Sequence, residues 1–101
     1  MYLSKQEQYD KICKEAERFW DRSSQMEENP VTHVLVGFTK TLETGELGNY
    51  LNDELYENVM NALINLNSGI DLRDSSKIMN NCQNLIKAIQ HFPSVRAMLN
   101  K

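Results

Sequence analysis

The sequence has few of the residues that interrupt regular structure or build a covalent framework. Its 101 residues include two prolines and four glycines, so long irregular or low-complexity segments are not expected. Cys13 and Cys82 could form at most one disulfide, and both fall on predicted apolar helix faces, where we expect buried free thiols. A chain of this length can instead be stabilised by one modest hydrophobic core.

Long apolar runs are also lacking. No segment approaches the run of about 20 residues that a membrane span needs. The first twenty residues carry Lys5, Asp10, Lys11 and Lys14, without the apolar segment of a secretory signal. These absences predict a cytoplasmic protein that forms a single domain over residues 1–101.

Motifs that carry known chemistry are missing as well. The two histidines and two cysteines show none of the paired short spacings of structural zinc sites. The chain has no glycine-rich phosphate loop, no Gly-x-Ser-x-Gly turn and no His-Glu-x-x-His segment. We therefore expect no metal, no cofactor and no enzymatic activity.

The basic residues do not form a stripe that could follow a nucleic acid. The net charge is −3, and the basic row Lys11, Lys14, Arg18 and Arg22 is interleaved with acidic residues. Between residues 41 and 72 there is no lysine or arginine at all, although six acidic residues lie there. Direct nucleic-acid binding is therefore not expected, and the acidity is concentrated in the middle of the chain.

What the sequence does contain is helical periodicity with helix start and stop signals. Ser4 and Glu7 have the spacing of a capping box, and apolar residues then recur at three- and four-residue steps to about Met26. Asn29-Pro30 is a helix start signal, and Gly45 suits the C-terminal cap of that second helix.

The second half of the chain repeats this pattern. We expect a third helix from Asn49 or Asn52 to residues 67–69, a fourth that begins at Asp74 or Ser75 and stops before Pro93, and a short last helix capped by Ser94. The fold class predicted is all-α, an antiparallel four-helix bundle with a short C-terminal fifth helix. The residues expected at the centre of its core are Trp20, Leu35, Leu55 and Leu85.

Residues 31–38 allow a competing interpretation as a strand, because four of the eight are β-branched. Strict alternation fails, however, since both faces of such a strand would be mostly apolar and no second strand exists to pair with it. A helix is therefore favoured for this segment.

Asparagine is unusually frequent, with eleven residues. Three of these, Asn58, Asn61 and Asn65, fall inside the third predicted helix, and Asn80, Asn81 and Asn84 fall inside the fourth. Each costs roughly half a kcal/mol relative to alanine in a helix. These helices must therefore depend on tertiary packing or on a partner. The composition is also a weak indication of a bacterial or phage source with an AT-rich genome.

His33 lies in the most β-branched part of the chain, and helical geometry places it away from the predicted core, beside Gly37 and Lys40. The segment His33-Val34-Leu35-Val36-Gly37 resembles the His-x-Leu-Lys-Gly motif of histidine phosphotransfer domains at three of its five positions. The resemblance implies a phosphorylated His33 on a helical bundle. Val36 stands where that family has the lysine that offsets phosphoryl charge. An ordinary solvated histidine is the favoured interpretation.

The acidic segment offers a candidate binding surface. Tyr56, Met60 and Ile64 form a second apolar stripe on the third predicted helix, bordered by carboxylates. Either this helix is central and buried on two sides, or the stripe is an exposed interface that attracts a basic partner. The residues assigned to this candidate partner-binding surface are Glu43, Glu46, Asp53, Glu54, Tyr56, Glu57, Met60 and Ile64.

These observations predict a small protein-binding module. Its most specific form is an inhibitor or immunity-type protein that masks a basic partner, such as a toxin, a nuclease or another nucleic-acid-binding enzyme. Size, acidity and lack of catalytic motifs are similar to those of small bacterial immunity proteins and phage-encoded inhibitors. Two alternatives remain open: a histidine phosphotransfer protein that uses His33, and a structural adaptor or self-associating helical dimer.

Overall fold

Helices account for almost all of the backbone in the computed structural model, which describes residues 3–23 and 29–99, with the side chains of 23, 29–33, 35 and 99 excepted. No strand occurs in these two ranges, so the predicted all-α class is confirmed. The six helices are α1 (Lys5–Ser23), α2 (Asn29–Glu43), α3 (Glu46–Tyr50), α4 (Asp53–Leu72), α5 (Ser75–Ile89) and α6 (Pro93–Leu99).

The first helix begins as its sequence predicts. The Glu7 backbone N–H donates to Ser4 Oγ at 3.1 Å, and the Ser4 N–H donates to Glu7 Oε1 at 3.3 Å. This reciprocal pair is a capping box, which satisfies two backbone donors that a helix start leaves without partners.

Residues 31–38 are helical, so the strand alternative is wrong for this segment. The helix ends where Gly45 adopts a positive φ of 76° and its N–H donates to the Leu42 carbonyl at 3.2 Å, as expected of a glycine cap. Gly45 also starts α3, a five-residue helix that the sequence did not predict, which buries Leu47 completely.

Helix α4, which is the third helix predicted from the sequence, runs beyond its predicted end at residues 67–69. Gly69 does not stop it, because this glycine lies inside the helix where α5 comes close: a Cβ on Gly69 would lie 3.0 Å from Ile78 Cγ1. The stop is Arg73, in the left-handed conformation with φ 53°, whose N–H donates to Gly69 and Ile70 carbonyls. The helix begins as predicted, with Asn52 Oδ1 accepting from the Leu55 N–H at 2.8 Å.

The last two helices also start near their expected positions. Asp74 caps α5 by accepting from the Lys77 N–H at 3.1 Å. The short C-terminal helix α6 begins at Pro93, and Ser94 is not its cap: its N–H donates to Glu46 Oε1 at 3.2 Å, and its hydroxyl donates to the same carboxylate. A carboxylate from α3 therefore satisfies the start of α6 and joins the two short helices.

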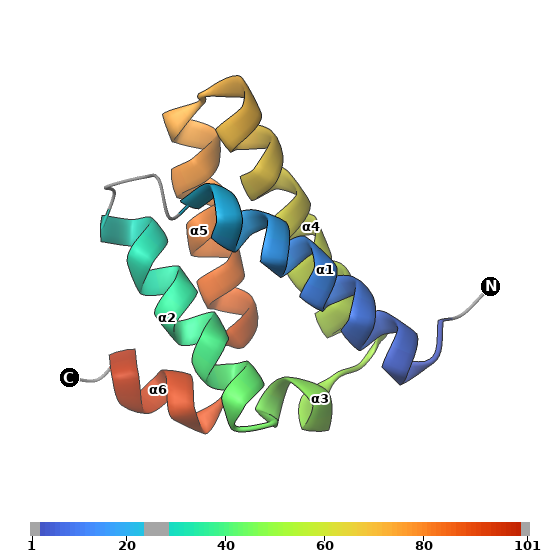
Figure 1. The fold of residues 1–101 in the computed structure, drawn as a ribbon. Coiled ribbons are helices and arrows are strands. Elements are labelled where there is room, and N and C mark those ends of the chain that lie inside the picture. The colour runs from blue at the N-terminus through green and yellow to red at the C-terminus, as the bar shows by residue number, and fades with distance from the viewer. Residues whose placement is uncertain (1–2, 24–28, 100–101) are drawn as a thin grey trace.

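Figure 1 shows α1 and α2 in front of the α4–α5 hairpin, with α1 packed on α4 and α2 packed on α5. The third and sixth helices pack against α2 at the lower end of the molecule. The principal extents of 37 × 33 × 19 Å fit two layers, since packed helices lie about 8–10 Å apart.

The two layers are not joined as an all-antiparallel bundle. Gln8 bonds to Asp53, Glu15 to Asn67 and Arg22 to Asp71, so the contacts advance together along α1 and α4. These helices therefore run in the same direction, unlike the predicted antiparallel packing. Periodicity defines the apolar face of each helix, but it does not specify which neighbour covers that face.

One hydrophobic core is shared by all six helices. Leu85 is fully buried, as predicted, but Trp20 and Leu55 are only partly buried, and the Leu35 side chain lies outside the described residues. Phe19 takes the central position on α1, and Trp20 packs at its edge against Phe38, with ring centroids 6.4 Å apart.

The prediction of buried free thiols is confirmed for one of the two cysteines. Both cysteines are free thiols; Cys82 is buried, as expected, whereas Cys13 is only half-buried. None of the described helices combines the length and apolar character that crossing a membrane requires.

Candidate functional site

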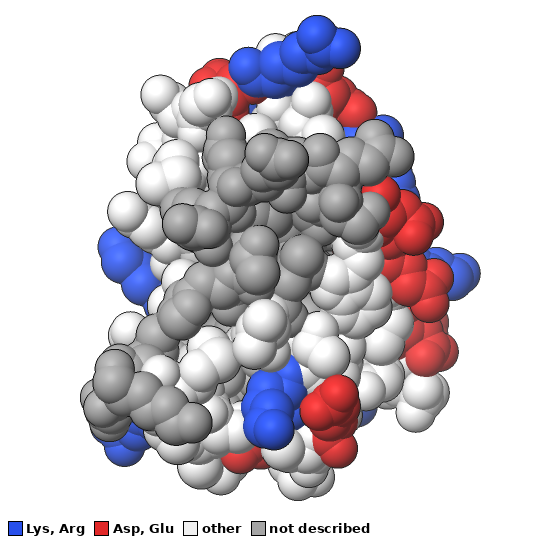
Figure 2. Space-filling view, turned by 60° about the vertical axis from the view of Figure 1, so that its left-hand side comes forward, with Lys and Arg blue, Asp and Glu red and all other residues white. Residues whose placement is uncertain are grey.

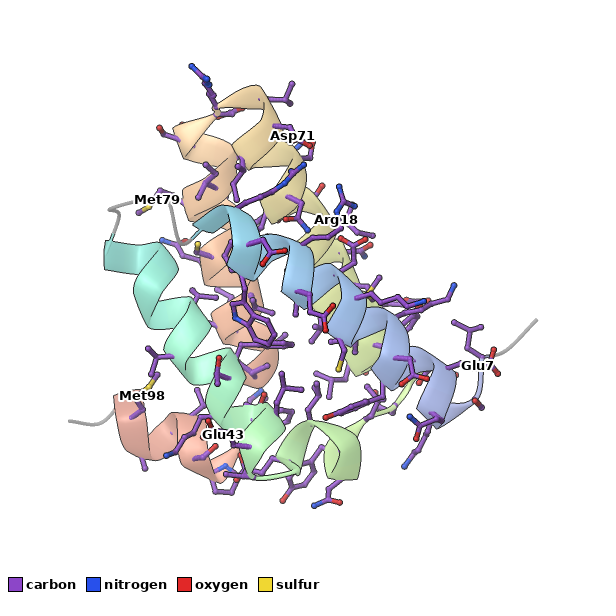
Figure 3. All side chains as sticks on the ribbon, in the orientation of Figure 1. Glu7, Arg18, Glu43, Asp71, Met79 and Met98 are labelled. Atoms are coloured by element: carbon purple, nitrogen blue, oxygen red, sulfur yellow. The ribbon has the colours of Figure 1, made fainter. Side chains whose placement is uncertain are left out.

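The eight residues predicted to bind a partner do not form one surface. Glu46 is occupied by its bonds to Ser94 of α6. Asp53 accepts a hydrogen bond from Gln8 Nε2 at 2.8 Å, which joins α4 to α1. Figure 3 shows Glu43 at the lower end of α2, whereas Asp71 lies near the upper end of α4. The acidity of residues 41–72 is therefore divided between structural contacts and separate exposed positions.

Glu54, Glu57 and Ile64 remain on the solvent side of α4. Both glutamates are exposed, and neither makes an ion pair with any described residue. The Ile64 side chain is 47% exposed. Glu57 and Ile64 are seven residues apart, so they point in nearly the same direction, offset by about 20°. These three residues, called the α4 acidic face below, are the part of the predicted surface that could meet a partner.

The other two residues of the stripe are turned towards the core. Tyr56 and Met60 are partly buried and pack against the core cluster. They lie on the side of α4 that also carries Asp53 and Asn67, whose bonding partners are on α1. Tyr56 and Met60 therefore fit the prediction that this helix is buried on two sides. Of the three residues in the stripe, only Ile64 fits the prediction of an exposed interface.

The His33 side chain lies outside the described residues, so phosphotransfer by this residue stays a hypothesis. Its expected neighbours on the solvent side of α2 can be placed. Lys40 is exposed, but Gly37 is buried beneath α6: a Cβ there would lie 3.1 Å from Met98 Cε. The expectation that Gly37 faces solvent is therefore wrong. Figure 2, turned toward the α2 side, shows charged side chains mostly near the margins of the described surface.

A groove between α4 and α5 is the site that the sequence did not identify. Two hollows of about 310 and 430 Å³ lie along the hairpin, and they share Asn58, Lys87 and Ala88 as walls. They are therefore two parts of one groove, called the hairpin groove below. The polar side chains that line its first hollow are Asn58, Asn61, Asn65, Asn81, Asn84 and Lys87.

The groove lies on the side of α4 opposite α1. Asn65 lines the groove, whereas Asn67 bonds to Glu15 of α1. Positions two residues apart on a helix differ in direction by roughly 200°, so Asn65 and Asn67 point to opposite sides of α4. Since α1 and α2 pack on the other face of the hairpin, the groove opens to solvent.

The amides in the groove differ in how they are bonded. Asn81 is buried, donates to the Lys77 carbonyl at 2.8 Å and accepts from Asn84 Nδ2 at 3.2 Å. Asn58, Asn61 and Asn65 make no side-chain hydrogen bond within the described part of the chain. Each of these three therefore has a donor and an acceptor free for a ligand.

The second hollow is more apolar and lies at the lower end of the hairpin. Tyr50 and Phe92 line it and stack with ring centroids 5.4 Å apart and planes inclined by 21°. Leu55 and Pro93 also line it, with Glu54 from the α4 acidic face. Leu55 is thus only partly buried because one side of it faces this hollow.

Asn67 shows that not every asparagine is available. Its side chain is 3% exposed, and its Nδ2 donates to Glu15 Oε2 at 3.0 Å and to the Glu15 carbonyl at 3.3 Å. Arg22 donates to the Asn67 carbonyl at 3.1 Å. The Asn67 Oδ1 has no hydrogen-bond partner among the described residues. Asn67 is therefore a structural contact between α1 and α4.

The half-buried Cys13 thiol offers little reactivity. Burial, together with the nearby Asp10 and Glu17 carboxylates, raises the pKa of the Cys13 thiol above its usual value. A thiol with a raised pKa is protonated at neutral pH and is a poor nucleophile. Among the described residues, no group of three or more His, Cys, Asp or Glu could hold a metal ion.

Comparison with known proteins gives no relative for this chain. No protein-family model matches it, and no curated protein or solved structure matches it significantly. Its function must therefore be argued from its own residues.

Proposed function

We propose that the protein is a binding module that captures a basic protein partner through the α4 acidic face. In its most specific form it is an inhibitor that masks a nucleic-acid-binding enzyme or toxin. The observation that carries the proposal is the pairing of unneutralised carboxylates, Glu54 and Glu57, with the exposed apolar side chain of Ile64 on one helix face.

Electrostatics and apolar burial would act at different stages of binding. Carboxylates at the rim of an interface speed association with a basic partner, and salt screens this effect over about 8–10 Å. An apolar side chain that becomes buried in the complex sets the dissociation rate. The absence of lysine and arginine from residues 41–72 keeps the local charge negative.

The first test is affinity capture from the cells that make the protein, followed by quantitative mass spectrometry. Glu57→Lys should lose the captured partner. Glu17→Lys is the matched control, because it makes the same change in net charge at an exposed position on α1. A captured set that is the same for both variants would contradict the proposal.

The second test measures rates against the captured partner by surface plasmon resonance. Glu57→Lys should slow association mainly at low salt, whereas Ile64→Ala should mainly speed dissociation. If the same surface instead joins two copies of this chain, light scattering will give a dimer mass that Ile64→Ala reduces to a monomer mass.

A further inference from the structure

We propose that the hairpin groove binds an extended segment of polypeptide, and that its asparagines hydrogen-bond to the main chain of that segment. The inference deepens the protein-binding function proposed above and rests on it. It names the form in which part of the partner is bound, and it draws on residues separate from Glu57 and Ile64.

The length of the groove fits a short extended chain. From Glu54 to Asn65 the helix advances by about 16 Å, at 1.5 Å per residue. An extended peptide advances by roughly 3.3 Å per residue, so about five residues would span this length. Asn61 and Asn65 are about 6 Å apart along the axis, close to the roughly 6.6 Å between main-chain groups on one edge of an extended chain.

The chemistry of the lining fits the peptide main chain. A primary amide carries donors and an acceptor, and in an extended chain the N–H and C=O of one residue point to the same side, so one asparagine can pair with both groups of that residue. Three asparagines on α4 have these groups free of partners among the described residues. Asn84 has an acceptor left over after its bond to Asn81.

The same lining is poorly suited to a nucleic acid. Lys87 and His91 are the basic side chains among the residues that line the two hollows. The Glu54 carboxylate also lines the second hollow. A nucleic-acid strand would place several phosphates along this length, and phosphate contacts dominate such binding. Neutral amides instead match a neutral backbone.

The placement of the asparagines argues against the view that they merely occupy solvent-exposed helix positions. Helices α4 and α5 hold seven asparagines, of which five line this one groove. The two others are Asn67, bonded to α1, and Asn80, exposed outside the groove. The remaining solvent positions of α4 include glutamate and aspartate. Glutamate forms helices better than asparagine does, and aspartate forms them about as well as asparagine. The groove therefore concentrates a residue type that costs helix stability.

The apolar hollow supplies an anchor at one end. Tyr50 and Phe92 present stacked rings there, beside Leu55 and Pro93. Aromatic and apolar pockets hold the side chains that contribute most to binding. The bound segment should therefore carry an aromatic or large aliphatic residue at the end that lies near α3.

The probe is a phage-displayed library of random heptapeptides, enriched on the immobilised whole protein. The best peptide is then synthesised and titrated while the asparagine side-chain NH₂ signals are followed by NMR. We expect the signals of Asn58, Asn61 and Asn65 to shift. A copy of the peptide with alternate main-chain nitrogens methylated should bind much more weakly, because it lacks the donors that the asparagines need.

The variant is Asn61→Ala with Asn65→Ala, and the control is Asn80→Ala, which lies on α5 outside the groove. Because alanine is the better helix former, the double variant should fold. It should weaken peptide binding by roughly ten- to thirty-fold, the loss expected for two hydrogen bonds. The control should change binding by less than about two-fold.

Several outcomes would overturn the proposal. These are a library without enrichment, binding unaffected by the double variant, and a methylated peptide that binds as tightly as the original. Asparagine-dependent binding of a single-stranded oligonucleotide, with no peptide binding, would assign the groove to nucleic acid instead. If Glu57→Lys abolishes peptide binding and the double variant does not, the groove fails. If the double variant loses the peptide while Glu57→Lys keeps the peptide and loses the captured partner, both surfaces stand. If Glu57→Lys keeps the captured partner as well, the groove stands and the α4 acidic face fails.

Discussion

The two long sides of α4 use the same residue type for different purposes. On the side of α1, Asn67 is buried and its Nδ2 is bonded twice to Glu15. On the side of the hairpin groove, Asn61 and Asn65 have no partner among the described residues. The asparagine that joins two helices is hydrogen-bonded to its neighbour, whereas the asparagines proposed to bind a ligand face solvent. Bonding state therefore separates structural asparagines from candidate binding ones.

The largest expected effect concerns the apolar contact beneath the groove. Leu85 is fully buried on α5, in the core that holds the hairpin and both other long helices together. Leu85→Ala should lower the free energy of unfolding by roughly 2–5 kcal/mol, measured by urea denaturation. Exposed Gln83→Ala on the same helix is the control and should change it by less than about 0.5 kcal/mol. Equal losses would mean that α5 is misplaced.

A smaller effect should separate the two sides of α4. Asn67→Asp replaces a buried donor by a carboxylate that faces Glu15 Oε2, at 3.0 Å in the native contact. We expect a loss of about 2 kcal/mol at neutral pH, because a buried charge is left facing another negative charge. Asn65→Asp in the open groove should cost much less.

The pH dependence of this pair sharpens the comparison. Burial and the Glu15 carboxylate should raise the pKa of the new carboxyl in the folded state above its unfolded value of about 4. The folded state then binds more protons, so the stability of Asn67→Asp should fall as the pH rises through that window and recover in acid. Thermal melts from pH 4 to 8 measure this. A flat difference between the two variants would contradict the burial of Asn67.

Local signals were predictable from the sequence, and long-range pairings were not. The Ser4–Glu7 capping box and the Gly45 cap each depend on residues within three or four positions of one another. The five-residue helix α3 is too short to show a period. The direction of α1 along α4 depends on contacts such as Glu15 with Asn67, which are 52 residues apart. Hydrophobic periodicity contains no information about such pairs.

The candidate site was predictable to a similar degree. The acidic run correctly indicated exposed Glu54 and Glu57, but sequence spacing alone placed Tyr56 and Met60 beside them as equals. Their burial depends on α1, which crosses that side of α4. The asparagines indicated helices that depend on tertiary packing or on a partner. Their convergence on one groove required the α4–α5 hairpin, which brings positions 58, 61 and 65 opposite 81 and 84.

The smallest expected effect has the opposite sign. Asn65→Ala removes a residue that costs helix stability and has no hydrogen bond to lose among the described residues. The free energy of unfolding should therefore rise by roughly 0.5 kcal/mol, the difference in helix propensity between alanine and asparagine. Asn61→Ala should behave in the same way, and the two gains should nearly add. Urea denaturation of both single variants and the double variant measures this. A loss of stability would show that these amides stabilise the hairpin itself, and a residue that stabilises the free protein is a structural contact like Asn67. A gain in stability joined to a loss of peptide binding is the combination expected if these asparagines serve a ligand rather than the fold.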